Sequence, residues 1–233
     1  MDNFRKLIGA VLLAGVVAGL LLFTVQHFTI FPLIQKAEVY ESAAEHTSPH
    51  AEHEESAWHP ADGTERTLYT ILTTVLTAIG FSALWFGVAA AGSVSLNWRS
   101  GLVYGVLAFL CIDVAPAFGL PPEPPGAPVA DLYSRQLWWV GTVLATAVGL
   151  WLMIGHGRSI LRRLTGLVVL IVPHAIGAPV AVGENVVPLD LMHRFAAASI
   201  LTTGMFWITL GLLGGLLYQR FRIAEQSEVA FPR

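Results

Sequence analysis

Cysteine is nearly absent from this chain, which contains Cys111 and no other. A single cysteine excludes a disulfide within one chain and leaves a thiolate metal site without a second sulfur ligand. Cys111 lies in a long apolar run, where we expect a small packing residue. The sequence also lacks the G-x-x-x-x-G-K-[ST] pattern that cradles phosphates, so the chain itself is not expected to use ATP.

Charged residues are scarce as well, at 12% of the chain against about a quarter in ordinary soluble domains. The mean hydropathy is +0.63. Six apolar runs each approach the roughly 20 residues that cross the hydrocarbon core. These runs are residues 7–28, 68–91, 101–118, 136–154, 164–182 and 195–217. We therefore predict an all-α integral membrane protein, a six-helix transmembrane bundle that forms a single domain over residues 1–233.

Glycine pairs recur inside the runs, at positions where one helix can approach another closely. Small residues drive helix packing in lipid, where hydrophobicity alone gives helices no reason to associate. The pairs are Gly15 with Gly19 and Gly101 with Gly105, and a third group contains Gly211, Gly214 and Gly215. We interpret them as packing sites.

Basic residues predict the orientation, because Lys and Arg near span ends are retained on the cytoplasmic side. Nine fall on one side of the predicted spans: Arg5, Lys6, Arg99, Arg158, Arg162, Arg163, Arg220, Arg222 and Arg233. Four fall on the other: Lys36, Arg66, Arg135 and Arg194. Both termini are therefore predicted to be cytoplasmic, in a multi-pass protein of the cell inner (plasma) membrane. The first run is too long for a signal-peptide h-region, so we expect an uncleaved span.

The predicted outer loop, residues 29–67, is acidic and contains histidines. It carries His46, His50, His53 and His59 among several glutamates. Glu38 and Glu41 precede them with i, i+3 spacing, which places both carboxylates on one face if the chain stays helical there. Imidazole and carboxylate ligands suit ions such as Co²⁺, Ni²⁺ and Zn²⁺. The loop is therefore either a metal-gathering segment or a solvated acidic tether in which the histidines are incidental.

Several polar groups lie within or beside the predicted spans. Ionisable groups at such depth usually face the bundle interior and mark an ion or proton path. The candidates are Gln26, His27, Asp113, His174, Glu184 and His193. Asp113 lies about 18 Å from the inner end of its span, from a rise of ~1.5 Å per residue. Together with the loop histidines they suggest an acidic funnel that leads inward.

Each of these groups also has a structural interpretation. His27 and His193 can simply lie at the membrane interface. Asp113 can pair with Arg135 or cap a helix that breaks before Pro116. The tryptophans near span ends, Trp98, Trp138 and Trp139, are typical of interfacial aromatic belts.

Four stretches of the sequence resemble one known family. They are FRKLIGAVLLAGVVAGLL, PLIQKAEVYE, HPADGTERTLYT and APAFGLPPEPPGAPVADLYSRQLWWVGTVLATAVGL. These stretches resemble CbtA, the probable cobalt transporter subunit associated with cobalamin biosynthesis. The resemblance covers nearly the whole chain and is most specific at PPEPPG followed by RQLWW. The motif residues that carry it are Glu38, Tyr40, Glu41, Glu65, Arg66, Pro121, Glu123, Pro125, Gly126, Arg135 and Gln136.

The resemblance implies a cobalt permease component that works with a CbtB-like partner, a small single-span membrane protein with a His-rich tail. It implies five spans, whereas the apolar runs predict six. We expect Co²⁺ or Ni²⁺ as the transported or bound ion, no tightly bound cofactor and no enzymatic activity. Besides the CbtB-like protein, the expected partner is the lipid bilayer, and no nucleic-acid partner is expected. One alternative is a non-transporting membrane metal sensor or scaffold. Another is an intramembrane enzyme or a haem protein. Haem usually needs two axial histidine ligands within the spans, and His174 is the one histidine predicted to lie well inside a span.

Overall fold

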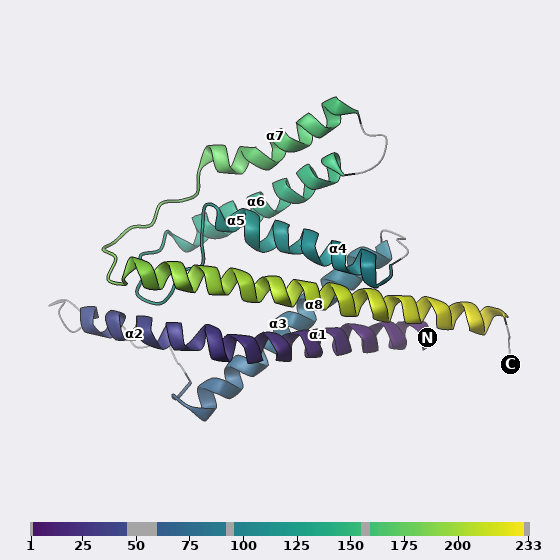
Figure 1. The fold of residues 1–233 in the computed structure, drawn as a ribbon, viewed down its shortest axis with the longest axis horizontal. Helices are drawn as coiled ribbons and strands as arrows, with labels where there is room; N and C mark the ends of the chain where they lie inside the picture. Colours follow the sequence, from purple (N-terminus) through teal and green to yellow (C-terminus); the bar gives the residue numbers. More distant parts are fainter. Residues whose placement is uncertain (1, 46–59, 92–95, 155–158, 231–233) are drawn as a thin grey trace. The chain divides into compact units, whose positions relative to one another are not determined.

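The computed structural model describes residues 2–45, 60–91, 96–154 and 159–230, and within these ranges every regular element is a helix (Figure 1). The elements are α1 (Asp2–Thr29), α2 (Phe31–Glu45), α3 (Thr64–Ala91), α4 (Trp98–Phe109), the π-helical segment η1 (Leu110–Val114), α5 (Ala115–Ala117), α6 (Leu132–Met153), α7 (Ile160–Ile176) and α8 (Leu189–Ala230). The predicted all-α class is confirmed for these residues.

Five of the helical stretches are long and apolar enough to cross a membrane. They are Phe4–Thr29, Thr64–Ala90, Trp98–Ala117, Leu132–Met153 and Leu189–Arg220. The chain is therefore a multi-pass membrane protein. The remaining predicted span, 164–182, corresponds to α7, whose 17 residues are at the lower limit for spanning. A sixth span remains a prediction.

Helix α7 begins earlier and ends earlier than the apolar run from which it was predicted. Ser159 caps its start by accepting the backbone N–H of Arg162 at 3.4 Å. Its end is set by Gly177, whose φ of +93° is a left-handed conformation that favours glycine. The predicted helical end at 182 was therefore wrong, because the chain leaves the helix at this glycine and runs irregularly to Pro188.

The predicted outer loop contains a helix. After an interruption at Ile30 the chain continues as α2, and the Ile30 carbonyl accepts the backbone N–H groups of Leu33 and Ile34 at 2.9 and 3.0 Å. Pro32 is tolerated because the first helical turn needs no N–H donor. The condition for placing Glu38 and Glu41 on one helix face is thus met. Residues 46–59, which carry the four loop histidines, lie outside the described ranges.

Two compact units make up the chain. The first consists of Met1–Phe28, Glu52–Leu107 and Thr202–Arg233, and the second consists of Thr29–Ala51 and Ala108–Leu201. Unit 1 thus holds α1, α3, most of α4 and the C-terminal part of α8. Unit 2 holds α2, η1, α5, α6, α7 and the start of α8.

Glycines bring the helices of unit 1 into backbone contact. A Cβ atom added to Gly15 of α1 would lie 2.6 Å from the Cα of Ile79 in α3. On α4 and α8, a Cβ on Gly101 would lie 2.8 Å from the Cα of Gly215, and one on Gly105 would lie 3.2 Å from the Cα of Gly211. The predicted role of these glycines in close helix packing is confirmed.

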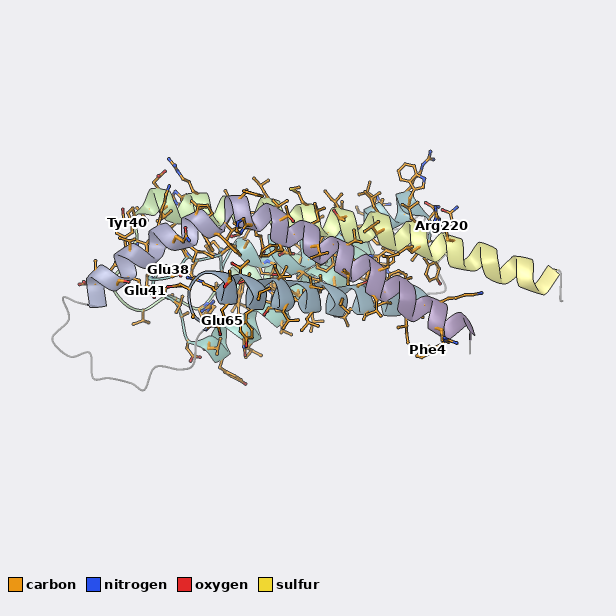
Figure 2. All side chains as sticks on the ribbon, turned by 90° about the horizontal axis from the view of Figure 1, so that it is seen from below. Phe4, Glu38, Tyr40, Glu41, Glu65 and Arg220 are labelled. Atoms are coloured by element: carbon orange, nitrogen blue, oxygen red, sulfur yellow. The ribbon has the colours of Figure 1, made fainter. Side chains whose placement is uncertain are left out.

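Within unit 1 the start of α1 and Arg220 of α8 lie at the same end (Figure 2). Figure 2 shows Phe4, near the start of α1, and Arg220, in α8, at one end of the unit, whereas Glu65 at the start of α3 lies at the other. Ser82 of α3 donates a hydrogen bond to the Val11 carbonyl of α1 at 2.9 Å. Helices α1 and α3 are therefore antiparallel neighbours.

In unit 2, α6 and α7 lie side by side as a hairpin (Figure 1). A Cβ atom on Gly149 of α6 would lie 2.7 Å from the carbonyl oxygen of Gly166 in α7, so this crossing also needs glycine. Unit 2 differs from unit 1 in the segments beside its helices. Residues 118–131 and 177–188 are irregular. Both segments contact α2, because Gly126 lies beside Glu41 and Val187 packs on Ala37.

Candidate functional site

Asp113 lies in a π-helical turn inside a candidate span. The π segment Leu110–Val114 joins α4 to α5, and the backbone N–H of Ala115 bonds to the Leu110 carbonyl, five residues back. Pro116 has no N–H, so the Ile112 carbonyl cannot receive the usual i+4 bond and the helix widens here. Single π turns often accompany functional sites. Since α5 continues through Pro116, the helix does not break before this proline, as one interpretation of Asp113 required.

The Asp113 side chain is half-buried, and Cys111 in the same segment is buried, as expected of a packing residue. Helix α6 packs against η1. Asp113 is thus an ionisable group partly buried in a candidate span, where a charged side chain costs a few kcal/mol to insert and such groups usually face the bundle interior.

His174 lies among aromatic rings near the end of α7. Its ring centroid is 5.9 Å from that of Trp138 and 6.3 Å from that of Phe118. The Trp138 indole N–H donates to the carbonyl of Pro173 at 3.3 Å. The prediction of Trp138 as a membrane-belt residue was therefore incomplete, because the half-buried indole fixes α6 to α7 beside His174. Gly119 makes room for the indole, since a Cβ there would overlap Cη2 of the ring and would lie 2.7 Å from Cζ2.

The proline-rich segment PPEPPG packs against α2. Gly126 ends this motif with φ +75°, and a Cβ atom there would lie 3.1 Å from the Cβ of Glu41. The same hypothetical atom would lie 3.4 Å from Val186, in the 177–188 segment. Gly126 is therefore required both by its backbone conformation and by this contact. Two motifs that are far apart in the sequence, around Glu41 and around Gly126, meet here.

Apolar residues fix α2 in the same unit. Ala37 of α2 is fully buried against Val187 and Leu191, and Leu33 and Met192 pack around them. The Asn185 side chain accepts the Val187 backbone N–H at 3.1 Å and so shapes the turn into α8. Figure 2 shows Glu38, Tyr40 and Glu41 along this helix. The two glutamates are thus carried on a packed helix.

Charges beside the proline-rich segment are coupled. Burial raises the pKa of the Glu123 carboxyl, and the nearby Arg135 guanidinium partly offsets this by favouring the charged form. Asp131 caps α6 and accepts the Ser134 backbone N–H at 2.9 Å and the Ser134 hydroxyl at 3.0 Å. These hydrogen bonds lower the pKa of Asp131. The motif residues Glu123 and Arg135 therefore interact electrostatically.

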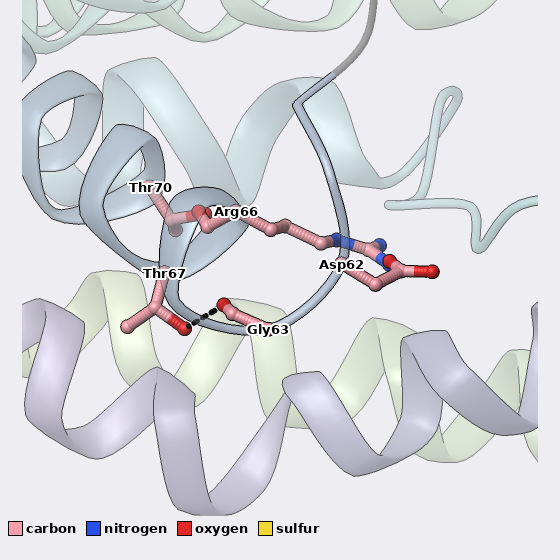
Figure 3. Close-up of polar contacts among 5 residues, drawn as sticks. All are labelled: Asp62, Gly63, Arg66, Thr67 and Thr70. Carbon is pink, nitrogen blue, oxygen red and sulfur yellow. Dashed lines mark hydrogen bonds and ion pairs between the residues drawn. The ribbon is translucent and has the colours of Figure 1, made fainter.

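The motif residues Glu65 and Arg66 belong to the start of α3, in unit 1. Arg66 forms an ion pair with Asp62 at 3.3 Å, and the Thr67 hydroxyl donates to the Gly63 carbonyl at 2.8 Å (Figure 3). Gly63 has φ +94°. Because both charged groups of the pair are exposed, it adds little stability, and the turn geometry defines this helix start.

The remaining predicted path residues are distributed over both units. In unit 1, half-buried Gln26 and exposed His27 lie near the end of α1, and the His27 ring is 5.7 Å from that of Phe23. In unit 2, Glu184 and His193 are exposed. Their use in ion transport, like that of Asp113 and His174, stays a prediction.

No group of three or more His, Cys, Asp or Glu side chains is arranged to hold a metal ion within the described ranges. Within these ranges, Glu38 and Glu41 therefore have no third His, Cys, Asp or Glu side chain placed to share a metal ion with them. The four predicted loop ligands, His46, His50, His53 and His59, lie outside these ranges.

One polar group on α6 was not predicted from the sequence. Thr146 is 3% exposed, and its hydroxyl has no hydrogen-bond partner in the part of the chain that the structure describes. Thr142, one turn earlier, donates its hydroxyl to the Trp138 carbonyl at 2.9 Å. The i, i+4 spacing of Trp138, Thr142 and Thr146 was visible in the sequence and marks one face of α6.

Comparison with known proteins gives one match. A family model for CbtA, described as a probable cobalt transporter subunit, matches residues 4–219. Neither the curated proteins nor the solved structures gave a match. The matched range includes the spans, the PPEPPG segment and the α2 motif. The chain therefore belongs to the CbtA family of probable cobalt transporter subunits.

Proposed function

We propose that this chain is the membrane permease subunit through which Co²⁺ enters the cell. The observation that carries the proposal is half-buried Asp113 in a π turn of a candidate span, in a chain of the CbtA family. A carboxylate at this depth can replace part of the hydration shell of a divalent cation. The cation is the cargo, so a path of transient contacts suits it better than a closed, high-affinity site.

The proposed path begins at an acidic surface and ends inside the membrane. His46, His50, His53 and His59 would gather the ion together with Glu38 and Glu41. Gln26, His27, Glu184 and His193 would line the entrance, and Asp113 and His174 would carry the ion further. Imidazole and carboxylate also bind Ni²⁺, which the Irving–Williams order favours over Co²⁺, so selectivity must come from geometry or from metal supply.

We infer a single transmembrane domain of six helices in the cell inner membrane, with both termini in the cytoplasm. The position of Phe4 and Arg220 at one end of unit 1 supports a common side for the two termini. The length of α7 is compatible with a sixth, short span. The 46–59 segment would then lie outside the cell, where its glutamates attract cations.

The word subunit in the family description implies a partner. We propose that this partner is a CbtB-like, small single-span protein with a His-rich tail, and that the imported cobalt serves cobalamin biosynthesis. The membrane potential is a sufficient driving force, because a divalent cation gains about 4.6 kcal/mol per 100 mV as it moves inward.

The contrasting function is a membrane metal sensor or scaffold that binds ions without moving them. In that case the 46–59 segment would matter and Asp113 would not. The absence of a three-ligand metal group from the described ranges leaves metal binding by such a scaffold to the 46–59 segment.

The test is ⁵⁷Co uptake in cells that lack other cobalt importers. The chain is expressed alone, with its CbtB-like partner, as Asp113→Ala and without residues 46–59, and the amount of each protein in the membrane is measured. We expect uptake that falls strongly in Asp113→Ala. If no strain takes up cobalt while the purified chain still binds the metal, the permease proposal is wrong and the sensor or scaffold proposal is favoured.

A further inference from the structure

Unit 2 contains an open groove between α2 and the first two turns of α8, with a volume of about 340 Å³. Lys36 and Tyr40 line it on α2, and Asp190, Leu191 and Arg194 line it on α8. The metal path proposed above uses none of these residues.

The groove has a net positive charge. It contains two cations, Lys36 and Arg194, and one carboxylate, Asp190. The Nε of Arg194 lies 3.1 Å from Asp190, an exposed i, i+4 pair that uses one edge of the guanidinium. Lys36 is exposed and forms no ion pair with another described residue. A positive groove is unusual here, because the neighbouring motif residues Glu38 and Glu41 are acidic.

The walls of the groove are apolar. Leu33 and Leu191 line it and belong to the cluster around fully buried Ala37. Val39, also in the lining, is 67% exposed. Cations above an apolar wall suit a ligand that has both an anionic group and a hydrocarbon part, whereas a small soluble anion would use only the cations.

The groove adjoins the ends of two candidate spans, which is where lipid headgroups are expected. The candidate span of α8 begins at Leu189, beside the groove, and the span of α1 ends at Thr29, two residues before α2 begins. Tyrosine and basic side chains are typical of this interfacial layer. Arg194 is five residues into α8, or about 7.5 Å, a depth from which a long side chain reaches the headgroups.

We propose that this groove binds the phosphate of an anionic phospholipid, such as phosphatidylglycerol, with Lys36 and Arg194 on the phosphate and an acyl chain against Leu33 and Leu191. A zwitterionic lipid fits less well because its own cation would approach Lys36 and Arg194. The bound lipid joins α2 to α8 and so holds the α2 glutamates in place. This inference rests on the membrane location of the chain and is independent of cobalt transport.

The test uses the full chain, purified in detergent and stripped of lipid. Native mass spectrometry counts bound phosphatidylglycerol, phosphatidylcholine or inorganic phosphate during titration. We expect preferential binding of phosphatidylglycerol and about a fivefold loss of affinity for each cation removed, as Lys36→Gln and as Arg194→Gln. Arg66→Gln is the matched control, because Arg66 also forms an exposed i, i+4 pair with an aspartate, and it should bind as the unchanged chain does.

Asp190→Asn provides a second measurement that does not depend on the folding of the cation variants. Removing the competing carboxylate should tighten phosphatidylglycerol binding by a similar factor. Equal retention of phosphatidylglycerol and phosphatidylcholine, or binding unaffected by Lys36→Gln and Asp190→Asn, would overturn the proposal. Displacement of the lipid by millimolar inorganic phosphate would instead identify a site for soluble anions.

Discussion

Different kinds of contact stabilise the inside of each of the two compact units of this chain. In unit 1, glycines of α1, α4 and α8 let helix backbones touch, and hydrocarbon side chains surround them. Among the described residues of unit 2, the α6–α7 crossing is of this kind, and an apolar cluster around Ala37, an indole N–H, a left-handed glycine and a half-buried carboxyl make further contacts. Asp113 and His174 are both in unit 2. Close glycine packing is thus most frequent in unit 1, whereas the two innermost candidate path residues belong to unit 2, and we propose that the ion path depends chiefly on unit 2.

The largest expected effect is on the glycine packing of unit 1. In Gly211→Leu the new Cβ would lie 2.5 Å from the Gly101 carbonyl oxygen and 3.0 Å from the Gly105 Cα, and neither backbone atom can move aside. We expect a loss of about 3 kcal/mol in unfolding free energy, the upper part of the range for overpacked sites. Thermal unfolding in detergent measures it.

Gly87→Leu is the control for this prediction, because a Cβ at Gly87 meets nothing within 4 Å. It should leave the unfolding temperature nearly unchanged. Equal destabilisation by both substitutions would show that the close α4–α8 contact does not support unit 1.

A smaller effect is expected at the indole beside His174. Trp138→Phe keeps an aromatic ring but removes the hydrogen bond to the Pro173 carbonyl. A hydrogen bond of this kind contributes about 1 kcal/mol. We expect a modest fall in unfolding temperature and a clear fall in cobalt uptake, since His174 loses its support. Trp139→Phe, at the exposed neighbouring position, should change neither the unfolding temperature nor the cobalt uptake. Equal effects of Trp138→Phe and Trp139→Phe would contradict a specific role for the Trp138 hydrogen bond.

Glu123 should give unit 2 a pH dependence. Its pKa is raised by burial, so the protonated form stabilises the folded state. This contribution is complete below the ordinary carboxyl pKa of about 4.3 and is lost as the pH rises through the raised value. Glu123→Gln should remove that part of the profile, as measured by unfolding temperature against pH. A profile identical to that of the unchanged chain would contradict the burial of this carboxyl.

The smallest effect is expected at the α6 cap. The lowered pKa of Asp131 means that its contribution is present above the ordinary carboxyl value, about 3.9, and is lost as the pH falls through the lowered value. Asparagine also caps helices well. Asp131→Asn should therefore leave the unfolding temperature at neutral pH unchanged and remove the part of its decrease at acid pH that comes from Asp131. A large decrease in unfolding temperature at neutral pH would show that the charge itself is needed.

The sequence was sufficient to predict the apolar helices and the glycine contacts, because hydrophobic length and small-residue spacing are local properties. It placed Glu38 and Glu41 on one helix face only on the condition that the chain stays helical there, and α2 meets this condition. It could not predict the contact between Gly126 and Glu41, because that contact joins segments that are distant in the sequence. The π turn at Asp113 has a local cause in Pro116, yet a proline predicts a break as readily as a π turn. The end of α7 was missed because the apolar run continues beyond Gly177.

Cobalt uptake into proteoliposomes tests the central claim most directly. The purified chain is reconstituted with and without its CbtB-like partner, a potential that is negative inside is imposed, and ⁵⁷Co accumulation is followed for the unchanged chain, Asp113→Ala and the neighbouring control Cys111→Ala. We predict accumulation that needs the potential, that is lost in Asp113→Ala and that persists in Cys111→Ala. Accumulation that is unchanged in Asp113→Ala would contradict an ion path through this carboxylate.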